Sequence, residues 1–207
     1  MLTRGNLLII AERATELLPT RKLNALLADF MPLNEVEVTS SAPASLIDDV
    51  RLFHAASLAG EYHEECRGHS NKVDDKSRGT DAFIAEFDRL TRWCIRAAKT
   101  APPLAVREAF ELLFELLRHI DKANDEIIFF ADEGGSRDIG VDWRAVFPAY
   151  FRCVGETASA HVFVRVVDQV IRDFADFERS THWQAARRVA NPEQKAALRA
   201  LPAVRKR

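Results

Sequence analysis

The stretch YHEECRGHS, at residues 62–70, contains the residues with the clearest potential for metal chemistry. His63, Cys66 and His69 follow one another at intervals of three residues. Thiolate and neutral imidazole are ligands that zinc favours, and two intervening residues let neighbouring ligands reach one ion. The spacing therefore predicts a zinc site as one hypothesis for this protein.

The fourth ligand of such a site is not fixed by the sequence. It would come from His54, from Glu64 or Glu65, or from an aspartate of the following loop. No second pair of ligands at short spacing follows, although such pairs make zinc signatures specific. The alternative interpretation is the polar end of a helix, followed by a mobile loop over residues 67–79 that is polar and contains two glycines.

The charged loop around Gly134 and Gly135 is a second candidate site. It does not fit a calcium loop, because Trp143 occupies the twelfth position, where a bidentate glutamate is needed. It does not fit a phosphate loop either, because the glycine pair is expected to end a helix and not to begin one. Loops on rigid scaffolds often carry function. We therefore expect a partner-binding edge formed by Asp132, Glu133, Arg137, Asp138 and Trp143. The alternative is a helix C-cap followed by an N-cap at Asp142.

No arrangement of residues in the sequence indicates catalysis. The Gly-x-Ser-x-Gly motif of serine hydrolases is absent. The neighbouring carboxylates Asp48-Asp49 and Asp74-Asp75 point apart on a helix or strand, so they cannot share a proton. We expect a non-catalytic interaction or scaffold protein that offers a helical surface to a protein partner. A zinc-binding protein or metal-dependent enzyme is the alternative.

Composition and charge indicate a globular protein. Hydrophobic residues make up 47% of the chain and charged residues 29%, and the formal net charge is -2. Whole-molecule charge therefore favours neither nucleic acid nor an acidic ligand. Residues 181–207 nevertheless contain seven lysines and arginines against one glutamate. These basic C-terminal helices and tail can attract an anionic partner, or they form a solvated terminus.

The cysteines and the apolar runs indicate in which cellular compartment the protein is expected. Cys66, Cys94 and Cys153 are odd in number and far apart, which is unlike a disulfide framework and suits a reducing environment. No apolar run approaches the roughly 18 residues of a membrane span. Glu12 and Arg13 interrupt the N-terminal apolar run too early for a signal peptide. We expect a cytoplasmic protein with no membrane contact and no cofactor besides zinc.

Apolar residues recur at steps of three and four along most of the chain, which predicts an all-α fold. Helices are expected at 7–18, 22–30, from Ser45 onward, from Thr80 onward, at 104–120, 125–133, 142–154 and 160–177, and after capping boxes at Thr181 and Asn191. Pro148 lies inside one of these patterns, so that helix is kinked or begins only near Val146. A short strand is an option at residues 36–38.

One internal similarity suggests how these helices are arranged. Arg107-x-x-Phe110-x-x-x-Phe114 recurs 37 residues later as Arg144-x-x-Phe147-x-x-x-Phe151. Such a period is typical of stacked helical hairpins, although two amphipathic helices can also match by chance. We expect one domain over residues 1–207 made of antiparallel helical hairpins, with a short HEAT-like α-solenoid in the C-terminal two thirds. Its parts are a helical N-terminal part (1–66), a mobile loop (67–79), a hairpin array (80–201) and a basic tail (202–207).

Overall fold

The computed structural model describes residues 43–63, 77–122, 127–128 and 135–200, all within one compact unit that spans residues 43–207. Over these residues the protein is all-helical and contains no strand, so the all-α prediction is confirmed. The α-helices are α3 (Pro43–Leu58), α4 (Arg78–Ala97), α5 (Pro103–Ile120), α6 (Trp143–Thr157), α7 (Ala160–Phe174), α8 (Arg179–Val189) and α9 (Pro192–Ala200), and the 3-10 helices are η1 (Ser136–Ile139) and η2 (Asp176–Glu178). The expected helices at 7–18 and 22–30 and the strand at 36–38 lie outside this part, and the single-domain prediction is not tested by it.

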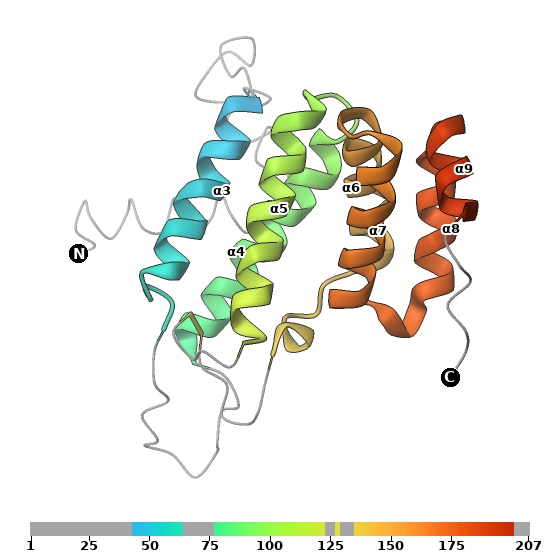
Figure 1. Cartoon of the computed structure of the whole chain (residues 1–207). Helices are drawn as coiled ribbons and strands as arrows, with labels where there is room; N and C mark the ends of the chain where they lie inside the picture. Colours follow the sequence, from blue (N-terminus) through green and yellow to red (C-terminus); the bar gives the residue numbers. More distant parts are fainter. Residues whose placement is uncertain (1–42, 64–76, 123–126, 129–134, 201–207) are drawn as a thin grey trace, which may run out of the picture. The chain divides into compact units, whose positions relative to one another are not determined.

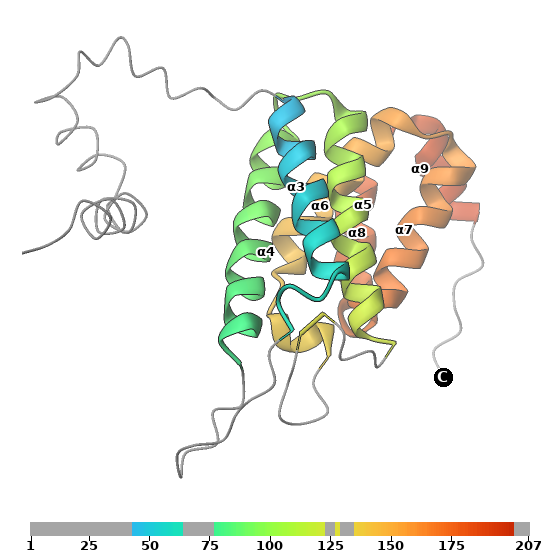
Figure 2. The ribbon, with the colours of Figure 1, turned by 90° about the vertical axis from the view of Figure 1, so that its left-hand side faces the viewer.

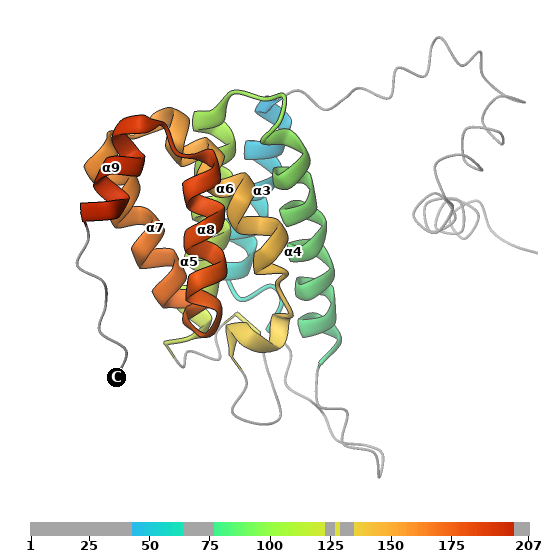
Figure 3. The same cartoon turned by 90° about the vertical axis from the view of Figure 1, so that its right-hand side faces the viewer.

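The helices follow one another across the unit, from α3 on one side to α8 and α9 on the other (Figure 1). Helix α3 packs against both α4 and α5 (Figure 2). Farther along, α6 contacts α8 and α7 contacts α9 (Figure 3). Consecutive helices from α3 to α8 therefore pack against one another, as hairpins do. The HEAT-like solenoid stays a prediction, since this order is shared by other helical folds. Among the described helices, none is long and apolar enough to cross a membrane.

Helix α5 lies at the centre of the core. Contacts with α3, α4 and α6 cover it on several sides. It starts at Pro103, directly after its N-cap Pro102, and the missing backbone N–H of Pro103 costs nothing because first-turn donors have no partner inside the helix. Its buried residues are Val106, Ala109, Phe110, Leu113, Phe114, Leu116, Leu117 and Ile120. The burial of so much apolar surface makes α5 the element against which the others are ordered.

The repeated motif places its phenylalanines in one aromatic network. Phe110, Phe114, Phe147 and Phe151 are all buried, and Tyr150 bridges the two helices by contacting Phe110 and Phe114 at ring-centroid distances of 5.7 and 5.0 Å. The two arginines of the motif differ in their partners. Arg107 pairs with Glu111 on its own helix at 2.7 Å, and Arg144 pairs with Glu178 of η2 at 2.5 Å. The similarity is thus one of buried rings and not of surface contacts.

Several predicted boundaries are wrong in the N-terminal half of the described chain. Helix α3 begins at Pro43, before Ser45, and ends at Leu58. Helix α4 begins at Arg78, inside the predicted loop over 67–79, because the buried Ser77 hydroxyl accepts a hydrogen bond from the Thr80 amide at 3.0 Å. Residues 127–128 are buried but not helical, so the helix expected at 125–133 is not formed there.

Boundaries in the C-terminal half differ for local reasons. Helix α6 runs from Trp143 through Pro148, so the later start near Val146 is wrong. Asp142 caps this helix and stabilises the start that the proline alone would not favour. Helix α7 ends at Phe174, not at residue 177, and α8 begins at Arg179, before the predicted cap at Thr181.

The capping box at Asn191 is confirmed and also links α9 to another part of the fold. The backbone amide of Gln194 donates to Asn191 Oδ1 at 2.9 Å, and the backbone amide of Asn191 donates to Gln194 Oε1 at 3.0 Å. Gln194 Nε2 donates to the carbonyls of Gly155 and Ala158, at 2.9 and 3.2 Å, where α6 ends. Gln194 is fully buried, so these carbonyls depend on it for satisfaction.

We expect Gln194→Ala to lower the free energy of unfolding by about 2–3 kcal/mol, because it removes a cap and leaves the carbonyls of two half-buried residues without this donor. Gln194→Glu is the matched control, since it keeps the acceptor of the cap and loses the two donors. Urea denaturation of the three proteins measures both losses. Equal stability of Gln194→Glu and the unchanged protein would show that the carbonyls do not need Nε2.

His182 is a buried imidazole on α8. It is 1% exposed, and its ring packs edge-on against Phe147 at a centroid distance of 4.8 Å. Its Nε2 has no hydrogen-bond partner, although Glu178 Oε2 lies 3.7 Å away. Burial lowers the pKa of His182 below its ordinary value of 6.5, Glu178 acts in the opposite direction, and Arg144 adds to the lowering. The folded protein therefore favours neutral His182.

This pKa shift predicts a loss of stability as the pH falls below 6.5. In that range the unfolded chain binds a proton that folded His182 does not bind, so the unfolded state gains stability. His182→Phe removes the titration and keeps a ring against Phe147. We expect urea denaturation to show a smaller decrease between pH 7 and about pH 5 in this variant. Parallel pH profiles for the two proteins would show that His182 is protonated equally in both states.

Candidate functional site

The proposed zinc ligands are only partly described. His54 lies on α3 with its Nε2 buried 3.4 Å from Glu115 Oε2 of α5, and His63 is exposed. Gly60 has φ of 76° and follows the end of α3, so His63 does not lie on a helix as the sequence interpretation assumed. Within the described ranges, no group of three or more His, Cys, Asp or Glu residues is placed to hold a metal ion. Cys66 and His69 lie outside these ranges, so the zinc site stays a prediction.

Three of the five residues predicted to bind a partner line one hollow. Arg137 and Asp138 of η1 and Trp143 of α6 lie together in it, whereas Asp132 and Glu133 fall outside the described residues. The hollow has a volume of about 630 Å³. Its remaining walls come from the end of α5, the end of α7 and η2. We call it the aromatic–acidic hollow; it is lined by Asp121, Gly135, Ser136, Arg137, Asp138, Gly140, Val141, Trp143, Asp173, Phe174 and Phe177.

Hydrogen bonds to carboxylates hold η1 in place. Asp121, just after α5, accepts from the Ser136 amide at 2.9 Å and from the Ser136 hydroxyl at 2.8 Å. Asp138 accepts from the Gly135 amide at 2.9 Å and so closes the turn from within. Gly140 then takes φ of 76°, which lets the chain turn toward α6. These contacts fix the exposed Arg137 and Asp138 relative to the rigid end of α5.

The aromatic wall of the hollow is ordered by ring stacking. Trp143 lies over Phe174 with ring centroids 4.9 Å apart and an interplanar angle of 12°. The Arg118 guanidinium lies 5.2 Å from the Phe174 ring and donates to Asp173 Oδ2 at 2.8 Å. Phe177 is different, because 75% of it is exposed. The wall therefore combines fixed rings with one ring that water reaches freely.

The charge of the hollow is weakly acidic. Asp121, Asp138 and Asp173 contribute three carboxylates, and Arg137 is the cation in its lining. Asp173 is paired with Arg118, but the Ser136 groups that donate to Asp121 are neutral. A cationic group would therefore find an aromatic face and a carboxylate in the same hollow, which is the combination that favours guanidinium and ammonium groups.

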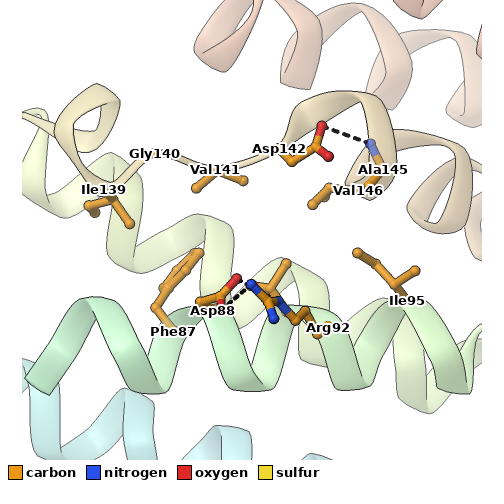
Figure 4. Close-up of a pocket in the computed structure, with 11 residues that line it drawn as sticks. Phe87, Asp88, Arg92, Ile95, Ile139, Gly140, Val141, Asp142, Ala145 and Val146 are labelled. Atoms are coloured by element: carbon orange, nitrogen blue, oxygen red, sulfur yellow. Dashed lines mark hydrogen bonds and ion pairs between the residues drawn. The ribbon is translucent and has the colours of Figure 1, made fainter.

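A second hollow lies on the other side of Gly140 and Val141. It has a volume of about 260 Å³ and separates α4 from the start of α6 (Figure 4). We call it the apolar hollow; it is lined by Phe87, Asp88, Thr91, Arg92, Ile95, Ile139, Gly140, Val141, Asp142, Ala145 and Val146. Because Gly140 and Val141 line both hollows, the two are neighbours.

Sequence reasoning missed the residues that distant elements contribute. Asp121, Asp173 and Phe174 are too far along the chain from Trp143 for their proximity to be inferred from spacing. Phe177 was assigned to the apolar stripe of a helix over 160–177, but α7 ends at Phe174 and Phe177 lies in η2. Its charged neighbours Asp176 and Glu178 were the one available signal that it is not a core residue.

None of the protein-family models, curated proteins or solved structures compared with this chain matches it. The fold and the two hollows are therefore interpreted from their own geometry.

The left-handed backbone conformation of Gly140, which lines both hollows, can be tested by substitution. A Cβ built on Gly140 meets no atom within 4 Å, so Gly140→Ala is opposed by backbone strain alone. We expect it to lower the free energy of unfolding by about 1 kcal/mol, and Gly140→Asn to cost less because asparagine enters the left-handed region more easily. Urea denaturation measures both. Equal losses in the two variants would contradict a left-handed Gly140.

Proposed function

We propose that this chain is a non-catalytic interaction protein whose aromatic–acidic hollow binds a basic segment of a partner protein. The observation that carries the proposal is the exposed Phe177 ring in a hollow that also contains Trp143, Phe174 and the Asp121 carboxylate, which accepts hydrogen bonds from neutral groups of Ser136. Exposed aromatic rings beside fixed polar groups are typical of binding surfaces. The proposed partner supplies an arginine or lysine side chain.

The choice of a basic partner follows from the charges and rings of the hollow. Arg118 already lies over one ring of this wall, at Phe174, so a guanidinium is compatible with it. Phe177 offers a free ring of the same kind, and the Asp121 carboxylate supplies the counter-charge. An arginine that contacts both would gain a cation–π contact and a charge-assisted hydrogen bond.

The described cysteine thiols support a role without catalysis. Cys94 and Cys153 are both free and buried. Burial raises the pKa of Cys94 to about 12 and that of Cys153 to about 11. Both thiols are therefore protonated at neutral pH and are poor nucleophiles. Free thiols also fit the expected cytoplasmic location, which we keep as part of this proposal. An anionic partner for the basic C-terminal helices stays a prediction.

A displayed library of random peptides tests the proposal. We expect the peptides selected by the full chain to be enriched in arginine and lysine and to bind more weakly as salt is added. Phe177→Ala and Asp121→Asn should each weaken binding about tenfold, which corresponds to about 1.4 kcal/mol. Fluorescence anisotropy of labelled selected peptides measures the affinity.

Leu104→Ala is the matched control for this experiment. Leu104 is 66% exposed, comparable to Phe177, and lines neither hollow. This variant should bind the selected peptides as the unchanged protein does, and thermal melting checks that all three variants fold. Selection of acidic peptides, or equal losses in Phe177→Ala and Leu104→Ala, would reject the aromatic–acidic hollow as the binding surface.

A further inference from the structure

We infer that the apolar hollow receives one large apolar side chain of the same partner segment, so that the recognised sequence pairs a basic residue with a leucine, methionine or phenylalanine. The inference rests on the proposed function and adds a second point of contact to it. It follows from the walls, the rim and the position of the apolar hollow.

The walls of this hollow are apolar and held in place by the core. Phe87 and Ile95 point from α4 toward Val141 and Val146 on the opposite side (Figure 4). Phe87 and Val146 are almost fully buried, at 2% and 1% exposed. A volume of about 260 Å³ exceeds the ~150 Å³ that holds a benzene ring in an engineered protein cavity. One large side chain therefore fits.

The charged groups at the rim already have partners. Arg92 binds the Asp88 carboxylate through two nitrogens, at 3.0 and 2.9 Å. Asp142 Oδ1 accepts from the amides of Arg144 and Ala145 at 3.1 and 3.2 Å. Arg92 therefore neutralises Asp88, Asp142 keeps its negative charge at the start of α6, and the apolar walls between them select an apolar side chain.

The one polar group in the walls does not oppose an apolar occupant. Thr91 is 7% exposed, and its hydroxyl is buried without a hydrogen-bond partner. Because water does not reach this hydroxyl in the free protein, an entering methyl or ring removes no hydration from it. The cost of burying it has already been met on folding.

The position of the hollow connects it to the aromatic–acidic hollow. Gly140 and Val141 line both of them. Gly140 is exposed, and the space where its side chain would stand contains no atom within 4 Å. A partner backbone that crosses at Gly140 can therefore place side chains in both hollows. The lining that the two hollows share favours one extended segment over two separate ligands.

Labelled synthetic peptides with a glycine–serine background test this inference on the full chain. One series contains an arginine and a leucine at every spacing, and a second series replaces the leucine with serine. We expect the best arginine–leucine peptide to bind at least about tenfold more tightly than its serine counterpart. Fluorescence anisotropy measures both affinities.

Three substitutions show where the gain in affinity from the leucine arises. Ala145 lines the apolar hollow and is exposed, so Ala145→Leu narrows the hollow without altering the core. It should abolish the difference between the two peptides. Ala55→Leu makes the same change at an exposed position of α3 that lines neither hollow, and it should preserve the difference. Thr91→Val should also preserve it, and a tenfold loss in that variant would overturn an apolar occupant.

The outcomes separate this inference from the proposed function. Equal binding of the leucine and serine peptides overturns the inference and leaves the proposed function standing. Failure of every arginine peptide to bind overturns both. A self-association of the free protein that Ala145→Leu abolishes, measured by sedimentation, would assign the apolar hollow to a second copy of the chain and would also overturn the inference.

Discussion

The burial of α5 is the constraint on which the rest of the described fold depends. A helix that is apolar around most of its circumference is stable only when neighbours cover several of its sides, and α3, α4 and α6 do so. The rings of Phe110 and Phe114 meet Tyr150 of α6, so the two helices are fixed side by side. The end of α5 and the start of α6 are thereby held in a fixed relation, and the start of α6 lines both hollows.

Helix ends and the turn of η1 provide three of the carboxylates of this region. Asp121 follows the last residue of α5, Asp142 caps α6, and Asp138 closes the short turn of η1. Each carboxylate satisfies backbone amides and also lines a hollow. Because these side chains are already fixed by the fold, a partner would not have to order them on binding, which reduces the entropic cost of association.

Sequence patterns predicted the features that depend on residues close to one another in the chain. The apolar periodicity of α5 and the capping box at Asn191 were found because each is encoded within a few residues of itself. The grouping of Arg137, Asp138 and Trp143 was found because these residues are near one another in the chain. The α4 wall of the apolar hollow was not found, because Phe87 and Val146 come to line one hollow only through tertiary packing. The end of α7 at Phe174 was missed because the apolar spacing continues to Phe177.

Phe177 also affects how this protein behaves when nothing is bound to it. A ring that is 75% exposed can mediate self-association, and a partner-binding protein has to keep it accessible without aggregating. Asp176 and Glu178 flank the ring on both sides in the chain. Charged neighbours of this kind act as gatekeepers, because like-charge repulsion and hydration oppose the stacking of identical segments. The sequence of η2 thus combines an exposed aromatic residue that favours association with charged neighbours that oppose aggregation.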